Sequence, residues 1–320
     1  MTLARIIKNW NYVDLMRQTP SNSGRWDGVQ FTEQPLEVCD YLIVCNHLEQ
    51  DVNVVCPAES VWGIVQEPPV PEYLWLRKGF EDFSRIYTPD VSLSGPRYHH
   101  SHGALAWHVN KTYDELKACP IPEKVKVFSS VNSNKSVRPG HQFRLTFLEL
   151  LKSRIDQGFD LWGRGFQPLE DKWEGLAPYR YSLAVENCST PHYWTEKLAD
   201  CFLSWTMPIY YGATNIFDYF PQESIIWVDI SRPEEALDTN RQAVASDLWL
   251  RNREAIAYAR ELILDKYQFF PFFARRIDEV KNSNGNHTQA KKVFLPALLP
   301  PGAKKKSVIK KIMAFVRKLI

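Results

Sequence analysis

Short apolar runs alternate with amphipathic stretches along most of the chain, which is typical of a doubly wound α/β fold. In the first part of the chain, the apolar runs at residues 38–45 and 61–65 predict buried strands. The rest of the chain continues the alternation. It predicts strands at residues 125–128, 160–162, 181–185, 207–211 and 225–229, and helices at residues 143–153, 196–205 and over much of 233–280.

The length of the chain predicts two domains, because 320 residues are more than one hydrophobic core commonly organises. Residues 119–123 read Cys-Pro-Ile-Pro-Glu, and the two prolines predict a linker there. We therefore expect an N-terminal domain over residues 1–122 and a second domain over 123–281. Residues 282–320 are expected to form a linker and a tail.

The tail carries most of the positive charge. Residues 304–320 hold seven Lys or Arg and no acidic residue, so a total of +2 leaves −5 for residues 1–303. The net negative charge of residues 1–303 excludes nucleic acid as a natural partner, because binding to the phosphate backbone needs a basic surface. On a helix, the apolar residues of the tail form one stripe beside the basic ones, which predicts binding to an anionic membrane surface. A helix packed on the protein itself, or a disordered basic end, is the alternative.

The first residues become charged too early for an export signal, and no run of apolar residues is long enough to span a bilayer. We expect a cytoplasmic protein attached peripherally to the inner face of the cytoplasmic membrane. The six cysteines and eight histidines show no metal-ligand spacing. With 11 Trp, 14 Tyr and 17 Phe the chain is rich in aromatic side chains, which stack well on sugars.

Several phosphate-binding motifs are missing. Gly163 and Gly165 lack the third glycine of a dinucleotide-binding loop, there is no Walker loop, and no Asp-x-Asp pair occurs to hold a metal. We therefore expect neither a metal nor a cofactor. A phosphate group would have to be neutralised by side chains and by a helix N-terminus.

Residues 179–212 provide such a place. A predicted strand ends at Glu186 and Asn187, a polar loop follows, and a helix begins near Thr195. Ligands of open α/β sheets bind at the carboxyl ends of strands and at helix N-termini. Lys197 can reach a phosphate there, and Glu196 a pair of ribose hydroxyls.

The same residues resemble glycosyltransferase family 10, the GDP-fucose-dependent α1,3-fucosyltransferases and in particular the bacterial ones. The family signature has three parts, which are similar in order to residues 179–187, 193–197 and 206–212. The parts read Tyr-[Lys/Arg]-Phe-x-Leu-x-Phe-Glu-Asn, then Tyr-Val-Thr-Glu-Lys, then Thr-[Val/Ile]-Pro-[Val/Ile]-x-x-Gly. Upstream, residues 129–132, 144–151 and 162–164 resemble further family segments. The resemblance runs from about residue 128 to 229, and residues 1–120 match only loosely.

The resemblance implies a GT-B architecture, with two Rossmann-like doubly wound domains facing a central cleft. It also implies an inverting enzyme that transfers L-fucose from GDP-β-L-fucose to a hydroxyl of a glycan, of the α1,3 kind to an N-acetylglucosamine-type sugar in lipopolysaccharide or another surface glycan. The implied donor-binding residues are Arg144, Asn187, Tyr193, Trp194, Thr195, Glu196 and Lys197. Glu186 would orient their loop, Trp194 stands where the family has Val, and Gly163 and Arg164 are interpreted as structural.

An inverting transfer needs one carboxylate to take the acceptor proton. Glu67, which follows the predicted strand at 61–65, is the candidate by analogy with the family's acid at this place. Glu59 and Glu72 are the alternatives, and an acid after a strand is more often an ordinary surface residue. Two other functions stay open: a transferase for another GDP-deoxysugar, and a non-catalytic glycan-binding or scaffold module.

Overall fold

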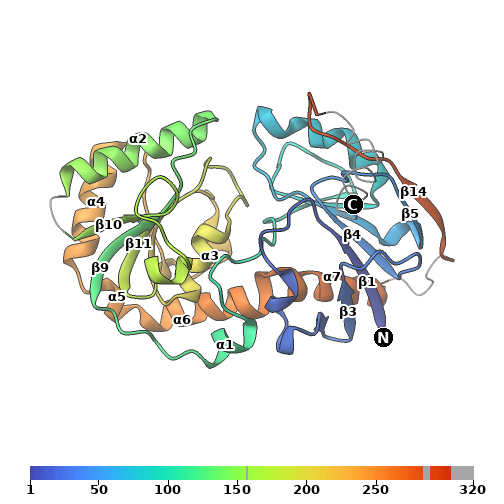
Figure 1. Ribbon diagram of the computed structural model, residues 1–320, viewed down its shortest axis with the longest axis horizontal. Helices are drawn as coiled ribbons and strands as arrows, with labels where there is room; N and C mark the ends of the chain where they lie inside the picture. The colour runs from blue at the N-terminus through green and yellow to red at the C-terminus, as the bar shows by residue number, and fades with distance from the viewer. Residues whose placement is uncertain (156–157, 284–288, 304–320) are drawn as a thin grey trace, which may run out of the picture.

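The computed structural model describes residues 1–155, 158–283 and 289–303, which form two lobes side by side (Figure 1). Each lobe is built around a largely parallel β-sheet with helices packed against it. Strands β4 (Tyr41–Cys45) and β11 (Tyr179–Val185) are buried over nearly their whole length. Parallel strands covered on both faces are apolar throughout, which is why they could be predicted from apolar runs.

The N-terminal lobe holds a seven-stranded sheet in the order β2-β3-β1-β4-β6-β7-β8. Only the β2–β3 pair is antiparallel. The remaining strands of this sheet are β1 (Thr2–Ile7), β2 (Arg25–Trp26), β3 (Val29–Thr32), β6 (Val61–Ile64), β7 (Arg85–Thr88) and β8 (Tyr98–His100). Because β1, β4, β6 and β7 run in the same direction, the loops that follow them lie along one edge of the sheet.

The C-terminal lobe holds a five-stranded sheet in the order β10-β9-β11-β12-β13, with every neighbouring pair parallel. Its other strands are β9 (Lys126–Val131), β10 (Phe159–Trp162), β12 (Met207–Tyr211) and β13 (Ile226–Trp227). Its helices are α2 (Pro139–Arg154), α3 (Glu196–Leu203), α4 (Pro233–Ala245), α5 (Leu248–Arg251) and α6 (Arg253–Leu262). Each β-α-β connection returns to the same edge, so the loops after β9 and β11 are neighbours. The sequence-based fold class, two doubly wound α/β domains, is confirmed.

The chain crosses between the lobes in places that differ from the expected boundaries. Trp107 and Val109 already pack in the core of the C-terminal lobe, ahead of the prolines at 119–123. Helix α1 (Tyr113–Ala118) follows them and buries Leu116 in the same core. The two prolines correctly indicate a loop, but the hydrophobic core of the second lobe begins before that loop, at Trp107.

The second crossing comes before residue 281. A π-helical turn (Ile263–Tyr267) leads into α7 (Phe269–Ser283), which Figure 1 shows continuing from α6 toward the N-terminal lobe. Phe270 packs edge-on against Phe31 of β3, and Phe273 stacks on Trp62 of β6. Strand β14 (Lys291–Leu295) then pairs antiparallel with β5 (Val52–Cys56). The residues expected to close the second domain and to form a linker therefore complete the first lobe.

Within the described residues, no helix combines the length and the apolar character needed to cross a bilayer. The tail at residues 304–320, for which a membrane-binding helix was expected, lies outside the described residues.

Candidate active site

The candidate site begins at the carboxyl end of β11, in the centre of the C-terminal sheet. Glu186 and Asn187 are the first residues after this strand. Thr195 is the N-cap of α3, and its hydroxyl accepts from the backbone N–H of Lys197 at 3.3 Å. The strand and the helix therefore deliver a carboxylate, an amide, a hydroxyl and an ammonium group to one place, as the sequence predicted.

Glu186 is the centre of this cluster. Its side chain is buried, and Oε1 accepts from the backbone N–H of Thr195 at 2.7 Å. The Thr195 hydroxyl lies 2.9 Å from both carboxylate oxygens, and Lys197 Nζ donates to Oε2 at 3.1 Å. Burial raises the pKa of Glu186, while Lys197 opposes that rise. Glu186 thus holds Thr195 and Lys197 at the first turn of α3, and its orienting of the donor-binding loop stays a prediction.

Lys197 lies between two carboxylates. Its Nζ is 3.1 Å from Glu186 and 3.7 Å from Glu196, and its side chain is 17% exposed. Burial by itself lowers the pKa of Lys197, but the two carboxylates outweigh it and hold the pKa above its ordinary value. Burial would likewise raise the pKa of Glu196, yet Lys197, His108 and Lys172 hold it well below the usual range. Both side chains are therefore charged at neutral pH and still partly accessible.

Arg144 reaches the same cluster from helix α2. Its guanidinium donates to Asn187 Oδ1 at 2.9 Å and to the carbonyl oxygen of Ser133 at 3.1 Å. Although the residue is only 4% exposed, its Nε has no hydrogen-bond partner among the described residues. Burial lowers the pKa of Arg144 and the carboxylates of Glu186 and Glu196 oppose this, so the guanidinium stays charged. A buried guanidinium with a free donor is suited to an anionic ligand.

The start of α2 approaches Asn187 very closely. A Cβ atom added to Gly140 would lie 1.8 Å from the Asn187 carbonyl oxygen, so only glycine allows this approach. The contact fixes the loop after β11 against the first turn of α2.

Two of the predicted donor-binding residues are buried in the loop. Tyr193 and Trp194 are 6% and 5% exposed. The Trp194 ring stacks on His102 with centroids 4.5 Å apart and packs edge-on against Tyr219. Trp194 therefore supports the loop through packing across the two lobes, and its contact with the donor stays a prediction.

Glu67 lies after β6, at the edge of the N-terminal sheet that carries the other loops. It lines a small cavity with Tyr73 and Asp90. Burial raises the pKa of Glu67, and the charges of Arg138, Lys135 and Lys197 oppose that rise. Those three cations belong to the C-terminal lobe, so Glu67 stands close enough to the cluster around Lys197 for their charges to interact.

The two alternatives to Glu67 lie in different parts of the N-terminal lobe. Glu59 precedes β6, in the short 3₁₀ turn Ala58–Ser60, and so lies at the opposite end of that strand. Glu72 is exposed at the start of the 3₁₀ helix η4 (Pro71–Asp82) and lines the cavity between the lobes. Of the two alternatives, Glu72 is therefore the one that lines the cavity between the lobes, while Glu67 lines the adjoining small cavity, with which it shares Pro68 and Tyr73.

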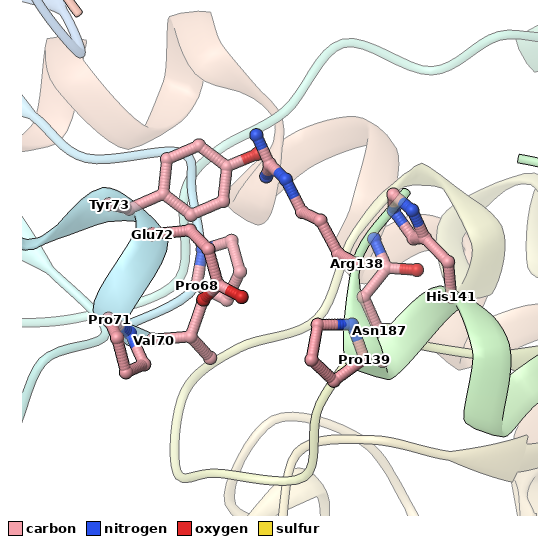
Figure 2. Close-up of a pocket in the computed structure, with 10 residues that line it drawn as sticks. Pro68, Val70, Pro71, Glu72, Tyr73, Arg138, Pro139, His141 and Asn187 are labelled. Carbon is pink, nitrogen blue, oxygen red and sulfur yellow. The ribbon is translucent and has the colours of Figure 1, made fainter. Parts of the chain in front are cut away.

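Figure 2 shows that cavity, which measures about 220 Å³. Pro68, Val70 and Tyr73 form its wall in the N-terminal lobe, while His141 and Asn187 face them from the other lobe. The guanidinium of Arg138 lies over the Tyr73 ring, 4.1 Å from its centroid, and so bridges the lobes. The loop that follows Glu67 therefore forms one wall of the cleft between the two lobes.

Other charged residues of the site were not predicted. Lys172 donates to the fully buried Asp200 of α3 at 2.7 Å, and Asp200 also accepts from the backbone N–H of His108 at 2.9 Å. His108 Nδ1 lies 3.9 Å from Glu196. These residues come from three distant segments, and only the fold unites them.

Lys135 and Arg138 were also missed, although they precede Pro139 at the first position of α2. The proline itself is a usable sequence signal for the start of α2, but nothing in the sequence connects the two basic residues with the site. Lys135 and Arg138 add positive charge at the edge of the cluster that holds Arg144 and Lys197, because both act on Glu67 across the cleft. Among the described residues there is no group of three or more His, Cys, Asp or Glu side chains that could hold a metal ion.

Comparison with known proteins gives a consistent result. Residues 121–247 match the model of the glycosyltransferase family 10 (fucosyltransferase) C-terminal domain. An alpha-(1,4)-fucosyltransferase of Arabidopsis thaliana is 39% identical over 62 residues, which is 18% of this chain and 16% of that protein. The alpha-(1,3)-fucosyltransferase FucT of Helicobacter pylori is 35% identical over 71 residues, covering 22% of this chain and 15% of that protein. The matches thus cover only a small part of these curated relatives.

Two solved structures share the fold. A crystal structure of an alpha1,3-fucosyltransferase with GDP gives a TM-score of 0.51 at 17% identity, over 89% of this chain and 91% of that one. Another structure of an alpha1,3-fucosyltransferase gives 0.50 at 18% identity, over 90% of both chains. The agreement extends over both lobes.

Proposed function

We propose that the chain transfers L-fucose from GDP-β-L-fucose to a hydroxyl of a glycan acceptor, with inversion at the anomeric carbon. The match of residues 121–247 to the glycosyltransferase family 10 C-terminal domain and the GT-B fold support a glycosyltransferase. The sugar, the stereochemistry and the acceptor belong to the proposal.

One observation carries it. Arg144, 4% exposed, and Lys197, 17% exposed in its side chain, converge from two helices on the carboxyl end of β11. A diphosphate leaving group gains negative charge as its bond to the sugar breaks, and preorganised donors at that point stabilise the transition state. The Nε of Arg144 has no hydrogen-bond partner among the described residues. Glu196, at the first turn of α3, is suited to accept hydrogen bonds from ribose hydroxyls.

In the proposed reaction, the acceptor hydroxyl attacks the anomeric carbon from the face opposite the diphosphate. The bond between that carbon and the β-phosphate oxygen breaks, and its electron pair leaves with GDP. Glu67 accepts the hydroxyl proton, and its raised pKa brings it closer to neutral pH, where a general base is most effective. Each lobe thus contributes one half of the reaction.

The donor needs no metal in this proposal, because cationic side chains supply the charge that a divalent ion would otherwise provide. GDP-fucose is the substrate, and no cofactor is consumed.

Transfer of another GDP-deoxysugar is an alternative function that would use the same cluster of charged residues. Another GDP-deoxysugar would bind through the same diphosphate and ribose contacts, and only the sugar pocket would differ. A non-catalytic glycan-binding module is the remaining alternative, and the charged cluster argues against it, since sugar binding alone needs no diphosphate site.

The test is an assay of sugar transfer with GDP-fucose and competing nucleotide sugars, namely GDP-mannose and GDP-deoxysugars other than GDP-fucose, against galactose- and N-acetylglucosamine-containing acceptors. We expect a fucosylated product with α-linkage, identified by NMR. Preference for another GDP-deoxysugar would replace the proposed donor, and binding of GDP-fucose without any turnover would favour the non-catalytic module.

We further propose that the acceptor is an N-acetylglucosamine-type sugar, linked α1,3, in a lipid-linked lipopolysaccharide or other surface glycan. The enzyme would reach it from the cytoplasmic face of the membrane through the basic residues 304–320. Removal of the residues after Pro301 is expected to abolish salt-sensitive binding to anionic vesicles and to leave turnover on soluble acceptors unchanged. Equal vesicle binding by both proteins at low salt would contradict the membrane proposal.

A further inference from the structure

Two free cysteines of the N-terminal lobe lie opposite each other on adjacent stretches of chain. The residues just before β4 run alongside β5, where the backbone N–H of Cys39 donates to the carbonyl oxygen of Val55 at 3.1 Å. This bond belongs to a parallel bridge between Val38 and Val55. Cys39 and Cys56 directly follow the two bridged residues, so they form the next pair in register, and their side chains lie on the same face.

The spacing of this pair suits a disulfide. Paired strands lie about 4.7–4.9 Å apart, and disulfides join residues whose Cα atoms are about 4.4–6.8 Å apart. The Cys56 thiol donates to the carbonyl oxygen of Asp40, the residue after Cys39, at 3.7 Å. Both cysteines also belong to the same core cluster, where Cys39 is 3% exposed and Cys56 is fully buried. The fold therefore holds the two thiols together in the reduced protein.

The surroundings of Cys39 favour its thiolate. Its pKa is lowered, mainly because the Cys56 thiol hydrogen-bonds to its sulfur, and further because the Arg5 guanidinium lies nearby; burial opposes both effects. Arg5 Nη1 donates to the carbonyl oxygen of Leu36 at 2.7 Å, while its buried Nε has no hydrogen-bond partner among the described residues. The thiolate is the form of cysteine that reacts with oxidants, and a neighbouring cation stabilises it.

The remaining buried cysteines have the opposite environment. Burial raises the pKa of Cys45, Cys188 and Cys201, in each case to about 12. These three thiols therefore stay protonated at neutral pH, which makes them poor nucleophiles. Cys39 is thus the thiol best prepared to react, and Cys56 is the thiol placed to react with it next.

A bond between Cys39 and Cys56 would join two sheets. Strands β5 and β14 form a separate two-stranded sheet, in which Cys56 pairs with Lys291 of β14. Cys39 lies just before β4, which is a central strand of the seven-stranded sheet. The cross-link would therefore fasten the last described strand of the chain, through β5, to the central sheet.

We propose that Cys39 and Cys56 are a redox modification site, which a hydroperoxide converts into a disulfide that fastens β14 to the N-terminal lobe. The inference goes beyond the proposed function. Cys39 precedes β4, whereas the loops of the cleft follow the strands, so the modification lies at the opposite end of the sheet from the proposed transfer.

The chemistry proceeds in two steps. The Cys39 thiolate attacks one oxygen of the peroxide, the O–O bond breaks, and the released hydroxide takes up the proton that the thiol had lost and becomes water. Cys39 is then a sulfenic acid. The sulfur of Cys56 attacks the sulfur of Cys39, the S–O bond breaks, and the oxygen leaves with the Cys56 proton as a second water. The two sulfur atoms together lose two electrons, and the peroxide gains them.

The test treats the folded full-length protein with an equimolar amount of hydrogen peroxide. The remaining thiols are then alkylated and counted in denaturant, and disulfides are located by mass spectrometry of unreduced peptides. The protein should lose two of its six thiols, with the bond between Cys39 and Cys56, and dithiothreitol should restore both. Amide hydrogen exchange in β5 and β14 should be slower in the oxidised protein than in the reduced one, because the cross-link suppresses local opening.

Three variants identify the two roles. Cys39→Ala should lose no thiol pair, and in Cys56→Ala the sulfenic acid should persist on Cys39, where dimedone traps it. Cys45→Ala is the matched control, since Cys45 is a buried cysteine at the other end of β4, and this variant should still form the disulfide.

Six thiols after peroxide treatment, or a disulfide that involves any other cysteine, would overturn the inference. Unchanged hydrogen exchange in β14 of the oxidised protein would also overturn it, because the cross-link would then not fasten that strand. Each of these readouts is independent of sugar transfer, so failure of the redox site and failure of the proposed function are distinguishable.

Discussion

Replacement of Arg144 by Ala tests the donor site through a residue that serves both stability and chemistry. In the structure its guanidinium makes two hydrogen bonds, to Asn187 and to Ser133, and is otherwise buried. Each bond to a charged group contributes about 1.5–3 kcal/mol, but the cost of burying the charge disappears with it, so we expect a net loss of about 1–3 kcal/mol in the free energy of unfolding. The variant should therefore still fold.

The effect on turnover should be larger than the effect on folding. A preorganised donor to a developing anion contributes about 10²–10³ in kcat, or about 2.7–4 kcal/mol of transition-state stabilisation. The assay is the initial rate of fucose transfer at saturating GDP-fucose, with unfolding measured in urea on the same protein. Arg144→Lys keeps a charge but loses the planar guanidinium, whose two terminal nitrogens reach Asn187 and Ser133 separately, so it should fall between the wild type and the Ala variant.

Arg154→Ala provides the control, because Arg154 ends the same helix with a half-exposed side chain. It should retain wild-type turnover. A folded Arg144→Ala variant with near-wild-type kcat and KM would refute the assignment of Arg144 to the leaving group.

Three further predictions concern the base, the metal and the pH. Glu67→Gln should abolish transfer and leave GDP binding nearly intact, since a base acts on the acceptor proton; normal transfer would shift the role to Glu72. Turnover should persist in EDTA, and complete loss that Mn²⁺ restores would show that a metal is required. Burial holds the pKa of His102 well below its ordinary value, and His102 Nδ1 accepts from the backbone N–H of Ala104 at 3.0 Å, so the folded protein keeps this ring neutral. As the pH falls below about 6.5 the unfolded chain takes up a proton that the folded one does not, which costs about 1.4 kcal/mol of stability per pH unit. His102→Phe should reduce this acid sensitivity, measured by urea unfolding at pH 7 and pH 5, and an unchanged slope would contradict the argument.

The central strands and the cluster at β11 and α3 could be predicted because their signals are local. Buried parallel strands have runs of consecutive apolar residues in the sequence. The site residues Glu186, Asn187, Thr195 and Lys197 lie within a dozen residues of one another. The structure brings these four together as expected.

What escaped prediction depends on contacts between distant segments. The aromatic face of α7 has a helical pattern that fits either lobe, and only its contacts with Phe31 and Trp62 show that it packs on the first sheet. The buried ion pair of Lys172 and Asp200 connects a loop to α3, and no residue spacing in the sequence predicts that pair. The stacking of Trp194 on His102 from the other lobe is a further contact between distant segments that the sequence did not predict.

The most direct test of the donor site is isothermal titration of GDP-fucose into the metal-free protein, with UDP-galactose as the competing nucleotide sugar and Lys197→Ala as the variant. The account predicts that the wild type binds GDP-fucose in EDTA, that UDP-galactose does not displace it, and that Lys197→Ala binds it much more weakly. Equal binding of GDP-fucose by the wild type and by a folded Lys197→Ala variant would contradict it.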